Sequence, residues 1–228
     1  MKSPVLTIDF FHDAVCGWCF VMSPKLRKLA AEFPIRVRHR TFVLQDSPAK
    51  LAAAFGSAEK AKSAILGHWE RCAEHDEGGR INVEGMRRQR FPYPAGKLSA
   101  KACKAAELQA GDAGHWDYFD AVQAAHLTEN RNIADETVLL DAARSCGLDI
   151  GRLRKDMHSA EVAQLVSRDR QLNEGTPRRM NRSLSASMTL PEFSLRSTRI
   201  AKHSRLYSSM MLSVRNALPS SVRQCTKS

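Results

Sequence analysis

The first 46 residues show two kinds of hydrophobic pattern in turn. Residues 5–11 form a nearly continuous run of β-branched and aromatic side chains, which has the length of a buried strand. From residue 18 to residue 33, apolar residues recur every three or four positions, which predicts an amphipathic helix that Pro34 ends. Residues 35–44 largely alternate apolar and polar side chains and predict a second strand. This order predicts a parallel strand pair with a right-handed crossover.

From Ser47 to about Glu174 the hydrophobic spacing is helical almost throughout. Six stretches carry this pattern or a helix-favouring composition: residues 51–55, 61–72, 100–110, 116–127, 135–146 and 160–172. Turn-rich links separate some of them, at residues 77–79 and 91–96. A helical block of roughly 120 residues is far longer than the usual crossover between parallel strands. We therefore expect an N-terminal strand–helix–strand unit over residues 1–46 and an inserted helical subdomain over residues 47–174.

The composition divides the chain near Gly175. Hydrophobic residues make up 43% of the 228 positions, which excludes disorder throughout. The formal net charge is +11, but residues 1–174 hold 25 Lys and Arg against 23 Asp and Glu, whereas residues 175–228 hold 10 against 1. Serine also rises, from 9 residues in the first part to 12 in the second. The basic charge therefore belongs to the C-terminal part and not to the folded unit expected before it.

Six cysteines occur, and only the first two are close together: positions 16, 19, 72, 103, 146 and 225. This spacing does not fit a small secreted scaffold held by disulfides. Cys72, Cys103 and Cys146 fall on helical stripes, and we expect them to pack as small hydrophobic residues. The N-terminal sequence shows no apolar signal segment, and no apolar run reaches the ~18 residues of a membrane helix. We therefore expect a cytoplasmic protein with no membrane partner, in which a close cysteine pair is redox-active or binds metal.

Cys16-Gly17-Trp18-Cys19 stands where the first predicted strand gives way to the predicted helix. A thiol at a helix N-terminus faces free backbone N–H groups and the positive end of the helix dipole, and both stabilise a thiolate. Cys19 lies nearly one turn further on, so it shares a face with Cys16 and can attack a mixed disulfide formed there. We therefore predict that Cys16 is the catalytic nucleophile and Cys19 the resolving thiol, with Gly17 and Trp18 as the active-site loop between them.

Other interpretations of these residues remain open. The cysteine pair could be buried by chance, could form half of a zinc site with Cys72 and His75, or could sense peroxide. His68 could join Cys72 and His75 as a metal ligand on one helix, but no fourth ligand is identifiable. His12 could tune the pKa of Cys16 from the loop before it. The strand-to-helix context favours redox exchange, so we expect no metal and no tightly bound organic cofactor.

Three ordered segments resemble a known family. Residues 13–20, Asp-Ala-Val-Cys-Gly-Trp-Cys-Phe, resemble the D-x-x-C-x-W-C-[YF] signature of the DsbA-like thioredoxin-fold oxidoreductases, particularly the cytoplasmic FrnE-like group. Residues 40–44 are similar to that group's R-x-F-x-L, and residues 125–140 to its A-x-x-T-E-x-x-x-I…V-L-L. The resemblance covers about residues 5–172. It implies an α/β, thioredoxin-like fold with a large inserted α-helical subdomain, and a disulfide oxidoreductase or isomerase that acts on protein substrates through Cys16 and Cys19.

Two rival functions remain, one suggested by the family resemblance and one by the basic charge of the C-terminal part. A related branch, the glutathione-dependent isomerases and kappa-class glutathione transferases, usually keeps a single serine or cysteine at this site. Two cysteines favour the oxidoreductase branch, and the alternative is a glutathione-using enzyme with a small aromatic substrate. A non-enzymatic binding protein with a basic tail is the second rival. The Gly17-Trp18 dipeptide does not indicate whether the exchange oxidises or reduces its substrates.

The C-terminal part, residues 175–228, is where the family completes its sheet with a cis-proline loop, two strands and a closing helix. Pro177 and Pro191 are the candidates for the cis-proline, and we favour Pro191 because an alternating stretch at residues 192–195 follows it. Residues 207–218 predict the closing helix. An altered reading frame near residue 174 would explain the atypical composition, and so would a genuine basic extension. Nucleic acid is not the partner we expect, because no RNA-binding aromatic motif or helix-turn-helix pattern occurs.

Overall fold

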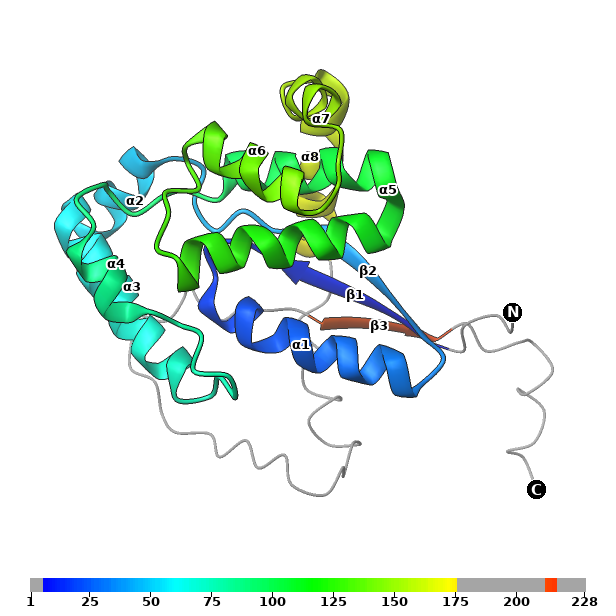
Figure 1. Ribbon diagram of the computed structural model, residues 1–228, viewed down its shortest axis with the longest axis horizontal. Coiled ribbons are helices and arrows are strands. Elements are labelled where there is room, and N and C mark those ends of the chain that lie inside the picture. The colour runs from blue at the N-terminus through cyan, green and yellow to red at the C-terminus, as the bar shows by residue number, and fades with distance from the viewer. Residues whose placement is uncertain (1–5, 176–211, 217–228) are drawn as a thin grey trace.

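A computed structural model describes residues 6–175 and 212–216 of the chain, and Figure 1 shows a small sheet flanked by helices. The elements follow in the order β1 (Leu6–His12), α1 (Gly17–Glu32), β2 (Ile35–Thr41), α2 (Pro48–Phe55), α3 (Ala58–Ala73), α4 (Val83–Arg88), α5 (Lys97–Gln123), η1 (Ala124–Thr128), α6 (Glu136–Ser145), α7 (Ile150–Met157), α8 (Ala160–Gly175) and β3 (Leu212–Asn216). No described helix is both long enough and apolar enough to cross a membrane.

β1 is the central strand of the described sheet, whose order is β2-β1-β3. It runs parallel to β2, with Leu6 opposite Ile35, and antiparallel to β3, with Ile8 opposite Val214. The last five residues of β1 are all buried, as its apolar run predicted for a strand covered on both faces. The predicted parallel pair is confirmed.

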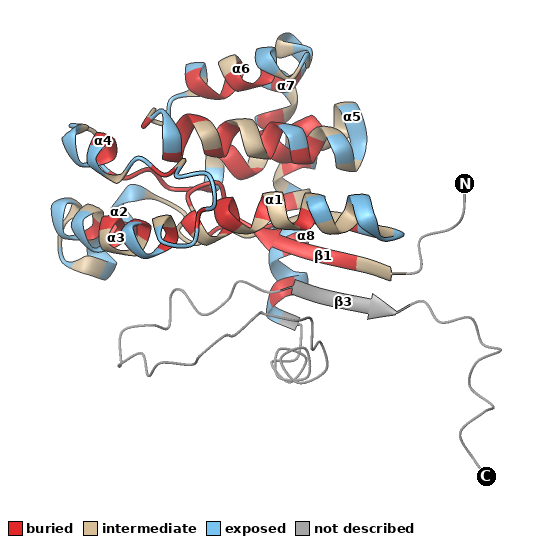
Figure 2. Cartoon of the chain, turned by 60° about the horizontal axis from the view of Figure 1, so that its bottom comes forward, coloured by how far each residue is buried: buried red, intermediate tan, exposed pale blue. Residues whose placement is uncertain are grey.

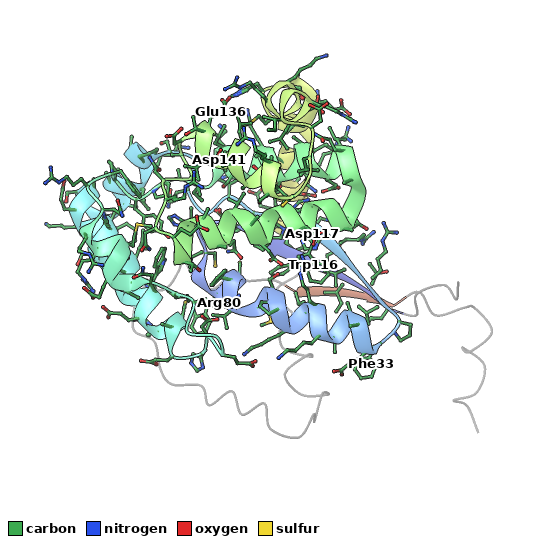
Figure 3. All side chains as sticks on the ribbon, in the orientation of Figure 1. Phe33, Arg80, Trp116, Asp117, Glu136 and Asp141 are labelled. Carbon is green, nitrogen blue, oxygen red and sulfur yellow. The ribbon has the colours of Figure 1, made fainter. Side chains whose placement is uncertain are left out.

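α1 contains a proline at position 24, and a side chain from another part of the chain compensates for it. Proline has no N–H, so the Phe20 carbonyl four residues earlier loses its partner in the helix. Arg80, in the loop after α3, donates to that oxygen from Nη2 at 3.3 Å. Its guanidinium also lies 4.0 Å from the centroid of the Phe20 ring, and Figure 3 shows Arg80 beside the first half of α1. The contact ties the loop after α3 to the start of α1.

A polar network joins α1 to α5. Trp116 Nε1 donates to Ser23 Oγ at 2.7 Å, and Ser23 Oγ donates to Asp120 Oδ1 at 2.6 Å. Arg27 pairs with Asp120 at 2.7 Å and with Asp117 at 2.8 Å. Trp116 and Asp117 lie between the two helices in Figure 3. These contacts fix α1, and with it the cysteine pair at its start, against the helical part of the molecule.

The helical part packs around α5, which contacts α6, α7, α8 and β2. The α5 backbone breaks at Ala110 and Gly111, and Gly111 has φ of +66°, a conformation that glycine adopts readily. This break separates the two helices predicted at residues 100–110 and 116–127. The short helices α4 and α7 have no counterpart among the predicted helices, because they hold only six and eight residues and so show little periodicity.

One hydrophobic core extends from the sheet into the helical part. Its largest fully buried side chains include Phe10 of β1, Trp69 of α3, and Tyr118 and Phe119 of α5. Figure 2 shows buried residues along β1, at the start of α1 and on one face of α5. The cysteine pair therefore lies where the sheet and the helical part meet.

The closing helix predicted over residues 207–218 is wrong at residues 212–216, which form β3. Leu-Ser-Val-Arg-Asn alternates apolar and polar residues, a period that suits a strand. Pairing with β1 also covers an edge of that strand that would otherwise expose its backbone N–H and C=O groups. Strand pairing therefore outweighed helix propensity here. Pro177, Pro191 and the strand predicted at residues 192–195 lie outside the described residues.

Candidate active site

Cys16 and Cys19 lie together at the N-terminus of α1. Cys16 is the N-cap, with an extended backbone at φ −91° and ψ 111°. Its carbonyl accepts hydrogen bonds from the backbone N–H groups of Cys19 at 3.1 Å and Phe20 at 3.2 Å. Cys16 is half-buried, whereas Cys19 is buried. The geometry therefore makes Cys16 the more accessible thiol of the pair.

The two thiols have opposite acidities. A hydrogen bond from the Cys19 thiol lowers the pKa of Cys16, with help from the N–H groups of Cys19 and Trp18, although burial and the Asp13 carboxylate act in the other direction. Burial raises the pKa of Cys19 well above its ordinary value, and the neighbouring Cys16 sulfur adds to this. When one thiol of the pair ionises, these shifts favour Cys16, whose thiolate would accept a hydrogen bond from the Cys19 thiol. Such a division suits one attacking and one resolving cysteine.

Asp13 fixes the loop that carries Cys16. Its carboxylate accepts hydrogen bonds from the backbone N–H groups of Val15 at 3.2 Å and Leu44 at 2.8 Å, so it joins the end of β1 to the segment after β2. Burial raises the pKa of Asp13 to about 6, against the opposing effect of these hydrogen bonds. Gly96 approaches so closely that a Cβ at that position would lie 1.9 Å from Asp13 Oδ1. A side chain at position 96 would displace this carboxylate.

Two buried side chains that the sequence analysis missed hold the loop from the other side. Gln123 Nε2, at the end of α5, donates to the Cys16 carbonyl at 3.1 Å and to the Asp13 carbonyl at 3.4 Å. The Tyr93 hydroxyl donates to the Val15 carbonyl at 2.7 Å. In the sequence, only the presence of a glutamine, Gln123, within an apolar helical stripe could have pointed to such a contact. Only folding brings it to Cys16, because the two are 107 positions apart.

A largely apolar groove opens beside the cysteine pair. It encloses roughly 610 Å³ of empty space, including the part open to solvent, between the redox loop, α2, α3 and the loop before α5. Leu51, Phe55 and Ile65 line it together with Trp18, whereas His68 is a polar group on its wall. Figure 1 places α2 and α3 near the N-terminal end of α1. A substrate that reaches Cys16 would therefore lie against apolar side chains.

Cys72 of α3 also lines this groove, next to the redox loop. A Cβ on Gly17 would lie 2.9 Å from Cys72 Sγ, so glycine at position 17 allows the close approach. Burial, with a smaller contribution from Cys16, raises the pKa of Cys72 to about 12. Cys72 is therefore a protonated, unreactive thiol at neutral pH. Cys72 and Cys103 are buried, as expected of small hydrophobic residues, and Cys146 is half-buried.

The remaining predicted residues have other surroundings. Trp18 is half-buried, and its ring centroid lies 5.3 Å from that of His75. His12 is buried against Phe119, with ring centroids 3.9 Å apart, so it faces the core and not the Cys16 loop. His68, Cys72 and His75 are not gathered as metal ligands. Within residues 6–175 and 212–216, a different set of three side chains lies close enough to share an ion: His12, His39 and His115.

Comparison with known proteins gives matches in sequence. The profile of the DSBA-like thioredoxin domain matches residues 7–176. The ClpXP adapter protein SpxH of Bacillus subtilis is 28% identical over 168 residues, which cover 74% of this chain and 53% of SpxH. SpxH of Shouchella clausii is 29% identical over 168 residues, with the same two coverages. The chain thus spans about half the length of these curated relatives.

Solved structures share the fold. The cytosolic disulfide reductase DsbM from Pseudomonas aeruginosa superposes with a TM-score of 0.59 and 23% sequence identity, over 79% of this chain and 81% of DsbM. The structure of DsbM with GSH gives a TM-score of 0.56 at 23% identity, over 79% of this chain and 82% of DsbM. The described strands and the helical part therefore belong to a recurrent fold.

Proposed function

Because the chain belongs to the DSBA-like thioredoxin domain family, we propose that it is a thiol–disulfide oxidoreductase that exchanges disulfides with protein substrates through Cys16 and Cys19. The observation that carries the proposal is the placement of two thiols nearly one turn apart at the start of α1, the first half-buried and the second buried. A depressed pKa supplies an attacking thiolate, and a raised pKa keeps the second thiol protonated until it is needed.

In the proposed reaction, the Cys16 thiolate attacks one sulfur of a substrate disulfide. The substrate S–S bond breaks, a Cys16–substrate disulfide forms, and the leaving substrate thiolate takes up a proton. Cys19 then loses its proton and attacks the Cys16 sulfur, which forms the Cys16–Cys19 disulfide and releases the reduced substrate. The reverse sequence oxidises a substrate. Isomerase activity would use the first step alone, followed by attack from another substrate thiol.

The groove beside Cys16 supports a polypeptide substrate. Its walls are mainly apolar, so an extended or partly unfolded chain could place a hydrophobic side chain there while its disulfide meets Cys16. A cytoplasmic location is part of the proposal, since thiols stay reduced there. The DsbM structure of similar fold is described as a cytosolic reductase. The curated relatives are named ClpXP adapter proteins, and this chain covers only about half of their length.

Glutathione is the second candidate partner. DsbM was solved with GSH, and the His68 imidazole is a polar group on the wall of the groove beside Cys16. A glutathione-dependent isomerase or transferase with a small aromatic substrate would need only one cysteine at this site. The two hypotheses therefore differ in what they expect of Cys19. We propose neither a membrane nor nucleic acid as a partner.

The test is turnover of a disulfide-linked fluorescent peptide by the full chain, with dithiothreitol or glutathione as the reductant. We expect Cys16→Ser to abolish turnover and Cys19→Ser to accumulate a mixed disulfide between Cys16 and the peptide, detected by mass spectrometry. Cys146→Ser, which changes a half-buried thiol outside the pair, is the matched control and should turn over like the unmodified chain. Full turnover by Cys16→Ser would contradict the proposal. Full glutathione-dependent turnover by Cys19→Ser would favour the glutathione-using branch.

A further inference from the structure

Three buried histidines meet in the core: His12 at the end of β1, His39 in β2 and His115 in α5. One ring nitrogen from each lies within 4.8 Å of those from the other two. The ring centroids are 5.2 Å apart for His12 and His39, 5.1 Å for His12 and His115, and 5.0 Å for His39 and His115. The rings therefore form a nearly equilateral triangle of imidazoles, which we call the histidine cluster.

Two nitrogens of this cluster have no hydrogen-bond partner among the described residues. His115 Nδ1 lies 2.6 Å from Glu107 Oε2, and because a carboxylate only accepts, this nitrogen carries the proton. His115 Nε2 is then an unprotonated, buried acceptor that no group of the described residues reaches, and the same holds for His39 Nε2. His39 Nδ1 and His12 Nε2 share one hydrogen bond at 3.2 Å. Orphaned polar atoms are uncommon in protein interiors, and an ion that binds among them is one physical explanation.

We infer that the histidine cluster is a binding site for a transition-metal ion of the zinc class. In a tetrahedral site with Zn–N bonds of about 2.0–2.1 Å, the centroids of imidazole ligands lie about 5.2 Å apart and their ligating nitrogens about 3.3 Å apart. The observed centroid separations already match, so ring rotation is the main adjustment that binding requires. The bond from His115 Nδ1 to Glu107 is the carboxylate–histidine contact that orients a ligating imidazole.

The surrounding charges are compatible with a bound cation. Lys104 and Arg27 are nearby positive groups, and Lys104 Nζ donates to the His39 carbonyl at 3.1 Å. It is paired with Glu107 at 2.7 Å and with Asp169 at 2.8 Å, so two carboxylates offset its charge. Burial also lowers the pKa of all three histidines, which leaves neutral imidazoles whose lone pairs can bind a metal.

A metal ion here would cross-link the two parts of the fold. Its ligands come from β1, β2 and α5, and His12 stands four residues before Cys16. The ion would thus fix the end of the strand that leads into the redox loop. The site uses neither Cys16 nor Cys19, so disulfide exchange and metal binding can fail independently of one another.

The test measures zinc bound to the full chain carrying Cys16→Ser and Cys19→Ser, which removes the two closely spaced thiols that would compete for zinc. The chain is incubated with zinc sulfate and passed through gel filtration to remove unbound metal. Inductively coupled plasma mass spectrometry should then find about one zinc ion per chain. His39→Gln and His115→Gln, made in the same background, should each lower this to about a tenth or less. His126→Gln is the matched control, since His126 is also buried with an unpartnered Nε2 but lies against Trp69 and Tyr93.

A second measurement keeps the inference testable if the cluster variants do not fold. Cobalt bound to the Cys16→Ser, Cys19→Ser chain should give visible d–d bands without a thiolate-to-metal charge-transfer band, because its ligands are nitrogens. A thiolate band would assign the ion to the remaining cysteines and overturn the inference. So would the absence of bound zinc in this chain, or equal zinc loss in His115→Gln and His126→Gln.

Discussion

Among single residues, Cys16 shows opposing influences on one thiol. Burial and the Asp13 carboxylate disfavour its thiolate, whereas the Cys19 thiol and two backbone N–H groups stabilise it. The net effect is a lowered pKa of Cys16. Each unit of pKa corresponds to about 1.4 kcal/mol, so a single lost hydrogen bond would change the thiolate population several-fold. The chemistry of the site therefore depends on how firmly the loop before Cys16 is held.

Gly17 provides a prediction about that loop. We expect Gly17→Ala to lower the free energy of unfolding by about 1–3 kcal/mol, because its new Cβ would lie 2.9 Å from Cys72 Sγ. Cys72→Ala removes that sulfur, so the double variant should recover part of the loss. Urea unfolding of the single and double variants forms a cycle that measures the coupling. Strictly additive effects would show that the two residues do not meet.

His126 gives a prediction about pH. Burial lowers its pKa to about 4, against 6.5 in an unfolded chain, so the folded state resists protonation. Its contribution to stability is present above pH 6.5 and is lost as the pH falls toward 4, by about 2 kcal/mol between pH 7 and pH 5. Thermal or urea unfolding at the two pH values should show a smaller loss for His126→Gln than for the unmodified chain. The same loss in both would contradict the assignment.

At the scale of elements, α1 joins the sheet to the helical part through the contacts at its two faces. Arg80 supplies the hydrogen bond that Pro24 removes, and Trp116 and Arg27 join the same helix to α5. The start of α1 is therefore held by groups from the loop after α3, and its middle by α5. A rigid helix is what places Cys19 at a fixed distance behind Cys16.

The Pro24–Arg80 pairing predicts non-additive effects on stability. Arg80→Met should lower the free energy of unfolding by about 2–4 kcal/mol, since it leaves both the Phe20 carbonyl and the buried Asp76 carboxylate without this donor. In a Pro24→Ala background the helix itself can supply an N–H to that carbonyl, so Arg80→Met should cost less. Urea unfolding of the four chains gives the coupling. Equal costs in both backgrounds would rule out the compensation.

Local pattern was enough to predict β1, α1, β2 and the place of the cysteine pair, because each depends on neighbours within about one turn or one strand. It was not enough for the groups that support the pair. Gln123, Tyr93 and the histidine cluster reach their positions only through packing between elements. The spacing of residues along the sequence does not predict such contacts between distant elements. β3 was mistaken for part of a helix because its partner strand lies about 200 residues earlier in the chain.

For the whole molecule, the sheet depends on a segment from the unusual C-terminal part. β3 covers one edge of β1, whose residues Ile8 and Phe10 belong to the core. The basic, Ser-rich composition of residues 175–228 therefore does not prevent a strand from that part from joining the fold.

A chain that ends at Gly175 should be less stable than the full chain and more prone to associate. Removing β3 leaves the backbone of β1 unpaired on one side, which is a template for pairing between molecules. We expect earlier urea unfolding and a larger size by light scattering. The control is a full chain with Pro in place of Ser213, which should impair β3 without shortening the protein. Unchanged stability in both would show that β3 contributes little.

The most direct test of the account is alkylation of the reduced full chain with iodoacetamide at about pH 6, followed by mass-spectrometric mapping of the labelled cysteines, since a thiol with an ordinary pKa of about 8.5 reacts slowly there. We predict rapid and selective labelling of Cys16, slower labelling of Cys16 when Cys19→Ala removes its hydrogen-bond donor, and no labelling of Cys72, whose pKa is about 12. Labelling of Cys16 no faster than that of Cys72 or Cys225 would contradict it, because the site would then hold no stabilised thiolate.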